Sequence, residues 1–266
     1  MTSERCKNSK LIRGVWRCFL DGKPEYLVRH YWWAYLWHWG VWFFDHQAII
    51  NMILFGQYRT LSQRALHACM QDRPVGRLLQ LTCAYGSMTP SLLKAMDDEL
   101  YLMDVAEIQL SATRKKLTDT QQKRLLSVQM NAEFLAYKEN AFATVLIFFL
   151  LHELPPAARA RSISEAIRVL QPGGRFVITE YAARPEKNLL WRFWATRIML
   201  QWLEPFLASF WQMDLAEVLY EHAQQQGKSI RQVDEFHCFS GFYRVAIFEL
   251  DGSPSSSSAN PSLPGT

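Results

Sequence analysis

The sequence predicts an α/β fold in which a mostly parallel sheet is flanked by helices. In the middle of the chain, short apolar runs rich in β-branched and aromatic residues alternate with helical segments, which is typical of an open parallel sheet. Near the C-terminus, two apolar runs within 229–250 surround a Phe-Ser-Gly turn and predict an antiparallel hairpin at the sheet edge. Two aromatic helical regions, 24–73 and 185–222, lie outside this pattern.

The individual elements follow from the spacing of apolar residues. Parallel strands are covered on both faces, so they read as short continuous apolar runs. Such runs predict strands at 76–84, 99–106, 143–151 and 174–181, and a weaker run predicts one more at 125–132. Helical spacing predicts helices at 89–96, 106–117 and 157–170. The last of these meets Gln-Pro-Gly-Gly, a stop signal for a helix.

Length and composition indicate one domain. A chain of 266 residues can bury a sizeable core, and we expect a single domain over 24–250 with a cap at 24–73 and inserted helices at 185–222. The ends, 1–23 and 251–266, are expected to be flexible, the second because it is rich in serine and proline. The nearest candidate for a membrane span, 141–151, is shorter than the about 20 residues required and is better explained as a strand.

Charge and cysteine content exclude several classes of protein. The formal net charge is +4, and Lys and Arg are scattered along the chain, so no nucleic-acid surface is predicted. The five cysteines form no C-x-x-C pair, which indicates a reducing compartment and no structural zinc. All ten tryptophans fall in two windows, 16–42 and 191–211, and this clustering indicates a special surface.

Ligands of a parallel sheet bind at the carboxyl ends of its strands. The first predicted strand ends in a loop in which Gly86 is the only glycine, so the G-x-G-x-x-G pattern of nicotinamide dehydrogenases is not met. The second strand ends at Asp104, whose carboxylate suits the two hydroxyls of a ribose, with capping of the next helix as the alternative. The third ends at Asn131–Ala132, where an amide and a backbone N–H can face an adenine edge.

Downstream residues carry a family resemblance. Residues 132–154 and 165–181, above all Arg-Val-Leu-Gln-Pro-Gly-Gly, resemble the class I S-adenosylmethionine-dependent methyltransferases, which implies a seven-stranded Rossmann-like sheet. The resemblance covers about residues 60–182 and 229–250. The cofactor contacts that it implies are Gln80, Thr82, Ala84, Tyr85, Gly86, Asp104, Val105, Asn131 and Ala132. The departures from the family pattern are Gln80, Asn131 and Ala143 in place of acids, and Thr82 and Ala84 in place of glycines.

The aromatic flanks narrow the resemblance. Residues 31–61, 81–92, 148–155 and 203–211 together are similar to the rhodoquinone biosynthesis members of this superfamily. That resemblance implies the conversion of ubiquinone to rhodoquinone, in which an amino group replaces a ring methoxy group. S-adenosylmethionine is then the amino donor, and manganese(II) supports the reaction. Two other functions stay open: methylation of a quinone precursor, and a non-catalytic scaffold at the membrane.

Three side chains are candidates for catalysis. His152 and Glu153 follow the fourth strand directly and suit a manganese-type ion, or His152 suits general-base catalysis; capping and core hydrogen bonding are the alternatives. Tyr85 is a candidate to hydrogen-bond a quinone oxygen, with simple packing as the alternative. The metal ligands are left open, with the Asp45–His46 pair and Glu180 as further candidates.

Gln80 suggests how an amine could become the nucleophile. An ammonium group cannot attack a quinone ring, and a carboxylate beside the cofactor's amine would raise the pKa of that amine. Gln80 stands where relatives carry that carboxylate, so we hypothesise that it keeps the amine easy to deprotonate. The alternative is that Gln80 only packs at the strand end.

The aromatic windows predict contact with a membrane surface. Trp and Tyr favour the membrane–water interface, and helices that carry them beside Lys and Arg lie in its plane. Segments 31–55 and 188–211 fit this description; the accompanying cations are Arg29, Arg59, Arg184, Lys187, Arg192 and Arg197. We therefore expect ubiquinone and a membrane as partners, and a peripheral protein on the cytoplasmic face of an inner membrane or at the mitochondrial inner membrane. An aromatic core beneath a helical lid is the alternative.

Overall fold

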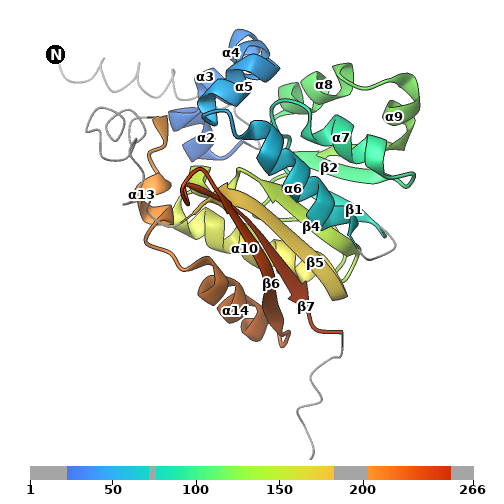
Figure 1. Cartoon of the computed structure of the whole chain (residues 1–266), viewed down its shortest axis with the longest axis vertical. Helices are drawn as coiled ribbons and strands as arrows, with labels where there is room; N and C mark the ends of the chain where they lie inside the picture. The colour runs from blue at the N-terminus through green and yellow to red at the C-terminus, as the bar shows by residue number, and fades with distance from the viewer. Residues whose placement is uncertain (1–22, 72–75, 183–202, 253–266) are drawn as a thin grey trace, which may run out of the picture.

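The computed structural model describes residues 23–71, 76–182 and 203–252, which build one seven-stranded sheet (Figure 1). The strands are β1 (Leu78–Leu81), β2 (Leu100–Asp104), β3 (Leu125–Gln129), β4 (Phe142–Phe148), β5 (Leu170–Tyr181), β6 (Ile230–Cys238) and β7 (Tyr243–Leu250). Their order is β3-β2-β1-β4-β5-β7-β6. β1 to β5 pair in parallel, and β7 runs antiparallel to both β5 and β6. The predicted fold class is confirmed.

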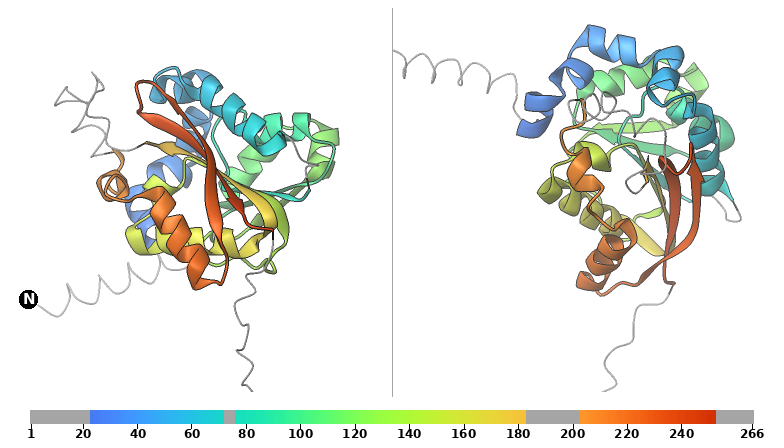
Figure 2. Two further views of the ribbon diagram at one scale, coloured as in Figure 1. Left: turned by 60° about the horizontal axis from the view of Figure 1, so that its bottom comes forward. Right: turned by 60° about the vertical axis from the view of Figure 1, so that its left-hand side comes forward.

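Helices cover both faces of the sheet: α6 and α7 pack together on one face, and α10 and α14 on the other (Figure 2). The helices are α2 (Glu25–His30), α3 (Trp32–Tyr35), α4 (His38–Phe44), α5 (Gln47–Ile53), α6 (Tyr58–Met70), α7 (Met88–Ala95), α8 (Glu107–Lys115), α9 (Asp119–Arg124), α10 (Pro156–Val169), α13 (Leu207–Phe210) and α14 (Leu215–Gln225). A 3-10 turn, η1 (Leu151–Glu153), follows β4. None of the described helices is long and apolar enough to cross a membrane.

The predicted strands and helices recur within a few residues, with one addition. Helix α9 was not predicted, because it buries no side chain and so leaves no apolar pattern. It begins instead with a capping box, in which the Thr118 hydroxyl accepts from the Gln121 N–H and the Gln121 side chain accepts from the Thr118 N–H. The expectations for both chain ends lie outside the described residues, as do those for Trp16, Trp191, Trp194, Trp202, Arg184, Lys187, Arg192 and Arg197.

The strand order reverses between β1 and β4, which places the ligand-binding crevice at their carboxyl ends. Both strands are apolar and buried because helices cover them on each side. The predicted cap, 24–73, contains α2 to α6. Its first four helices, α2 to α5, are called the cap from here on; they lie at one end of the molecule, and α14 lies at the other (Figures 1 and 2). The cap supplies the wall that closes the crevice.

Arg159 of α10 fixes the turn that follows β4. Its buried guanidinium donates to the carbonyl oxygens of Leu151 and Leu154 at 2.8 and 2.9 Å, and to the Phe206 carbonyl and the Ser209 hydroxyl at 3.2 Å each. Burial lowers the pKa of Arg159 to about 10, which still leaves it charged at neutral pH. One side chain therefore ties η1 to the segment that leads into α13.

We expect Arg159→Met to lower the free energy of unfolding by about 1–3 kcal/mol or more, because the buried carbonyl oxygens lose their hydrogen-bond donor. Urea denaturation measures this loss. Arg114→Met is the matched control. Arg114 is exposed, and within the described part of the chain its guanidinium bonds only to the Ser127 hydroxyl, so its replacement should change the free energy of unfolding by no more than about 0.5 kcal/mol. Equal costs for the two variants would contradict the structural role of Arg159.

Candidate functional site

Two adjoining cavities open at the carboxyl ends of the central strands. The larger, here called the central cavity, is mostly apolar and lies between the cap and the sheet. The smaller cavity lies beside it, over the ends of β2 and β3. The residues that line both are Tyr31, Tyr35, Cys83, Phe149 and Glu153. A ligand of two parts could therefore occupy both cavities at once.

The smaller cavity gathers most of the predicted cofactor contacts. Its lining includes Thr82, Asp104, Val105, Asn131 and Ala132. They come from the ends of three neighbouring strands, as expected for parallel strands whose carboxyl ends share one edge. Their role in binding a cofactor stays a prediction.

Asp104 is held in place by the backbone around it. Its carboxylate accepts from the Cys83 N–H at 3.0 Å and from the Ala106 N–H at 2.8 Å. Burial raises the pKa of Asp104 to about 6, against the lowering effect of these backbone hydrogen bonds. The Ala106 N–H belongs to the N-cap residue of α8, and no side chain of the described residues accepts from the first turn of that helix, so the capping alternative is not supported.

The loop after β1 is fastened to the cap. The Tyr85 hydroxyl donates to the Ala34 carbonyl oxygen and accepts from the Gln109 amide at 2.9 Å, and its ring stacks on Tyr35 with centroids 5.5 Å apart. Tyr85 lines the central cavity with its ring. Since its hydroxyl already has two partners, the predicted hydrogen bond to a substrate oxygen would compete with them.

Gly86 forms a tight turn in the loop after β1. Its φ is +80°, and a Cβ there would meet the Tyr58 ring at 2.7 Å. Its N–H donates to the Asp45 carboxylate at 3.0 Å, and that carboxylate also pairs with Lys116 at 2.7 Å. Asp45 thus fastens α4 to the loop, while the His46 ring nitrogen Nδ1 lies 2.7 Å from the Trp42 carbonyl oxygen.

Gln80 is fully buried behind these cavities. Its carbonyl oxygen accepts from the Thr89 hydroxyl at 3.0 Å, and its amide donates to the Thr82 carbonyl oxygen at 3.0 Å. The Asn131 side chain also has a partner: its Oδ1 atom accepts from the Glu133 N–H at 2.9 Å. Among the described residues that line the two cavities, Gln80 and Gly86 are absent, whereas Ala84 lines the central one. Their cofactor contacts stay predictions.

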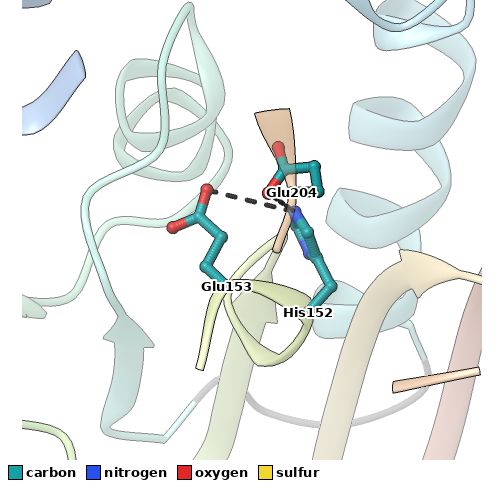
Figure 3. Close-up of side chains that lie close together, drawn as sticks. All are labelled: His152, Glu153 and Glu204. Atoms are coloured by element: carbon teal, nitrogen blue, oxygen red, sulfur yellow. Dashed lines mark ion pairs between the residues drawn. The ribbon is translucent and has the colours of Figure 1, made fainter. Parts of the chain in front are cut away.

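A cluster of His152, Glu153 and Glu204 projects into the central cavity (Figure 3). Two of the three come from η1, and Glu204 comes from the segment before α13. The His152 Nε2 atom lies 4.0 Å from a Glu153 oxygen and 3.8 Å from a Glu204 oxygen. One donor atom of each side chain lies within 4.8 Å of the others, so the three can converge on one cation.

Glu180 orients the histidine. Its carboxylate, fully buried at the end of β5, lies 2.7 Å from His152 Nδ1 and accepts from the Leu150 and Leu151 N–H groups at 2.8 and 2.6 Å. Burial lowers the pKa of His152, but Glu180 and Glu204 outweigh it and raise that pKa to about 9. With Nδ1 bound to Glu180, Nε2 is the ring nitrogen that faces the two other carboxylates.

Two tyrosines of the cap complete the cluster. The Tyr35 hydroxyl donates to Glu153, and the Tyr31 hydroxyl donates to Glu204 at 3.1 Å. Burial raises the pKa values of both Glu153 and Glu204, and the proximity of other carboxylates adds to this effect. Burial also raises the pKa of Tyr31 and of Tyr35 well above their ordinary value, so both stay protonated donors.

The donor set of the cluster fits a divalent cation. An imidazole nitrogen and two carboxylate oxygens suit manganese-type ions, and the carboxylate behind the imidazole is a common partner of a metal-binding histidine. Three acidic groups around one buried histidine are also costly without a compensating positive charge. Sequence reasoning named His152, Glu153 and Glu180 but missed Glu204, Tyr31 and Tyr35. The signal for Glu204 was a single carboxylate within an apolar aromatic run.

With the cavities in view, comparison with known proteins identifies the family. The model of the ubiE/COQ5 methyltransferase family matches residues 44–249. The chain belongs to the ubiE/COQ5 methyltransferase family. The match includes every predicted cofactor and catalytic residue, but it starts inside α4, so most of the cap lies outside the family model.

Relatives in this family cover part of the chain. A demethylmenaquinone methyltransferase of Lactiplantibacillus plantarum is 30% identical over 58% of this chain and 66% of its own length. A ubiquinone/menaquinone biosynthesis C-methyltransferase of Wigglesworthia glossinidia brevipalpis is 25% identical over 52% of this chain and 56% of its own length. The chain thus spans less than two thirds of either relative.

Solved structures support the fold. The N-methyltransferase NodS of Bradyrhizobium japonicum with bound S-adenosyl-L-homocysteine has a TM-score of 0.51 at 16% identity, over 72% of this chain and 86% of that one. The [4+2]-cyclase SpnF has a TM-score of 0.52 at 18% identity, over 71% of this chain and 80% of that one. The sheet is therefore the Rossmann-like sheet of class I S-adenosylmethionine-dependent methyltransferases, a fold that also carries a cyclase.

We expect the affinity for S-adenosylhomocysteine to depend on the charge of Asp104. The carboxylate can accept two ribose hydroxyls only when it is deprotonated, and its pKa is about 6. Affinity should therefore be constant above about pH 7 and fall about tenfold per pH unit well below pH 6. Isothermal titration calorimetry between pH 5 and 8 measures this. In Asp104→Asn the affinity should be weaker and lack this pH dependence; an unchanged profile in that variant would rule out Asp104 as the ribose acceptor.

Proposed function

We propose that this member of the ubiE/COQ5 family uses S-adenosylmethionine to modify a quinone ring, and that the modification is the amination that converts ubiquinone to rhodoquinone. The observation that carries this proposal is the His152, Glu153 and Glu204 cluster inside an apolar cavity beside the predicted cofactor cavity. A quinone ring with an apolar tail matches that lining. Since such a quinone dissolves in a bilayer, the proposed enzyme works at a membrane surface.

Manganese(II) held by His152, Glu153 and Glu204 would supply a Lewis acid for a quinone carbonyl. The chain itself performs the remaining tasks. The stacked rings of Tyr35 and Tyr85 line the cavity and can align a flat ring parallel to them. The cap excludes water, and this strengthens the electrostatic interactions within the cavity.

Proton movement accompanies amination. Attack of the cofactor's amine on the ring carbon forms a C–N bond; the amine loses a proton and the departing methoxy oxygen gains one, which releases methanol. The nitrogen is then still bound to the cofactor's α-carbon. Elimination of the amine together with a β-hydrogen breaks that bond, leaves an α,β-unsaturated carboxylate on the cofactor's remainder and needs no oxidant. Each of Glu153 and Glu204 would give one oxygen to the ion, and both carboxylates line the cavity, so the second oxygen of either is the proposed acceptor for the amine's proton. The protonated hydroxyls of Tyr31 and Tyr35 bind these carboxylates and keep them in place.

Methylation of a quinone precursor is the second candidate. It is favoured by the family match and by two methyltransferase relatives, whose names state activity on demethylmenaquinone or in ubiquinone and menaquinone biosynthesis. Amination is favoured by the departures at Thr82 and Ala84, which line the two cavities, and by the metal-capable cluster. Two formed cavities and a retained Asp104 speak against the third reading, a scaffold without activity.

Product analysis distinguishes these functions. The purified chain is incubated with S-adenosylmethionine, manganese(II) and a short-tail ubiquinone, and the quinones are analysed by mass spectrometry. We expect a product in which NH2 has replaced OCH3. A product that gains CH2 from a demethylated precursor would instead establish methylation, and the absence of either product with bound cofactor would support the scaffold.

Glu204→Gln should lower the rate of product formation about 10²-fold or more, because it removes one of the two carboxylates that face His152. It should also weaken manganese(II) binding, measured by electron paramagnetic resonance of the free ion, while S-adenosylhomocysteine binding stays within twofold. Glu221→Gln, an exposed position on α14, is the control and should change none of these. Wild-type rates and metal binding in Glu204→Gln would refute the role of the cluster.

A further inference from the structure

The cap exposes an unusual amount of aromatic and aliphatic surface. Across the described residues, the exposed large hydrophobic side chains outside the cap are Leu126, Val128, Phe134 and Tyr220. Those of the cap are Trp32, Trp37, Trp39, Trp42, Phe43, Met52 and Ile53, here called the outer face. Trp39 is 66% and Met52 65% exposed, which is close to full exposure for a folded chain. Such concentration marks an interaction surface.

Each tryptophan of the outer face presents an apolar ring and an indole N–H that has no hydrogen-bond partner among the described residues. Trp39 and Trp42 contact each other edge to face at 6.0 Å, and Trp32 and Trp37 lie 6.4 Å apart. Their indole N–H groups make no hydrogen bond to any described residue, unlike that of Trp33, which donates to the His30 carbonyl oxygen at 3.0 Å. At a membrane–water interface, the ring enters the acyl boundary and the N–H meets water or a headgroup.

A groove beside the outer face carries excess positive charge. It lies between the cap and α8, and its charged lining residues are Lys23, Asp45, Glu107, Lys115 and Lys116, with His38 and His46 beside them. Asp45 is paired with Lys116, whereas Lys23 and Lys115 make no ion pair with any described residue. Trp42 lines the same groove, so apolar and basic surfaces adjoin. This combination complements anionic lipid headgroups.

The cap also forms a wall of the central cavity. Trp33, Tyr35 and Phe44 line it, while the preceding residues Trp32 and Phe43 are exposed. Ile53 belongs to both surfaces, since it lines the cavity and is 39% exposed. The outer face and the lining of the proposed quinone site therefore meet at Ile53.

We propose that the outer face of the cap docks the protein on a bilayer that contains anionic phospholipids, with Lys23 and Lys115 beside phosphate groups and the cavity mouth at Ile53 turned toward the acyl chains. The proposal rests on the proposed function for the identity of the lipid-soluble substrate. Each cap helix is short, between four and seven residues. The cap thus rests in the interface and does not cross it.

Vesicle flotation of the full chain tests the docking surface. We expect wild-type protein to bind phosphatidylcholine vesicles that contain phosphatidylglycerol, and to bind pure phosphatidylcholine vesicles less well. Combined replacement Trp39→Ser, Trp42→Ser and Phe43→Ser should weaken binding to both at least about tenfold. Lys23→Gln with Lys115→Gln should remove only the preference for the anionic vesicles. Tyr220→Ser, which alters an exposed ring on α14 at the opposite end of the molecule, should change neither.

The triple variant must keep its circular dichroism and its affinity for S-adenosylhomocysteine, so that loss of binding is not loss of folding. Unchanged flotation in that variant, or a wild-type chain that floats with neither vesicle, overturns the proposal. A wild-type dimer that the triple variant breaks into monomers also overturns it, because the outer face would then join two copies. The product test with a short-tail quinone in solution fails or succeeds independently, since it needs no vesicle.

Discussion

The candidate site depends on the hydrogen bonds that the buried carboxylate of Glu180 makes. This carboxylate sits at the end of β5, accepts two backbone N–H groups from the turn after β4, and holds Nδ1 of His152. A carboxylate without exposure is costly unless its hydrogen-bonding capacity is met, and these three contacts meet most of it. The same contacts join β4 to β5 where the chain leaves the sheet. They also decide which nitrogen of His152 faces the cavity.

A second set of contacts gives a structural role to the bulky Tyr85 in the loop after β1. Tyr85 reaches the Ala34 carbonyl of the cap, and the Gly86 N–H binds Asp45, which Lys116 also holds. A small residue at position 85 would leave the cap without this attachment. The large Tyr85 side chain, which looks out of place in a cofactor loop, thus fastens the cap over the crevice. Most of the cap precedes the part of the chain that the family model matches.

Fold and reaction are separate questions for this molecule. The Rossmann-like sheet and the ubiE/COQ5 family assignment establish a methyltransferase scaffold. They leave the transferred group open, because function depends on the site built upon a fold. In this chain the site adds a histidine, two facing carboxylates and stacked tyrosines to the scaffold. Charged and aromatic groups of this kind suit ring activation and proton transfer, so the proposal of amination rests on the site and not on the fold.

The sequence by itself determined the sheet, its flanking helices and the strand ends at which Asp104, Asn131 and His152 stand, because periodicity and strand endings are local properties of the chain. It also placed aromatic residues in the cap, but it did not determine which of them face outward. Only the tertiary structure decided that Glu204 joins His152 and Glu153, that Glu180 stands behind the histidine, and that Asp45 holds the loop after β1. Such contacts join residues 28 to 52 positions apart, and no local pattern encodes which side chains the folded sheet brings face to face.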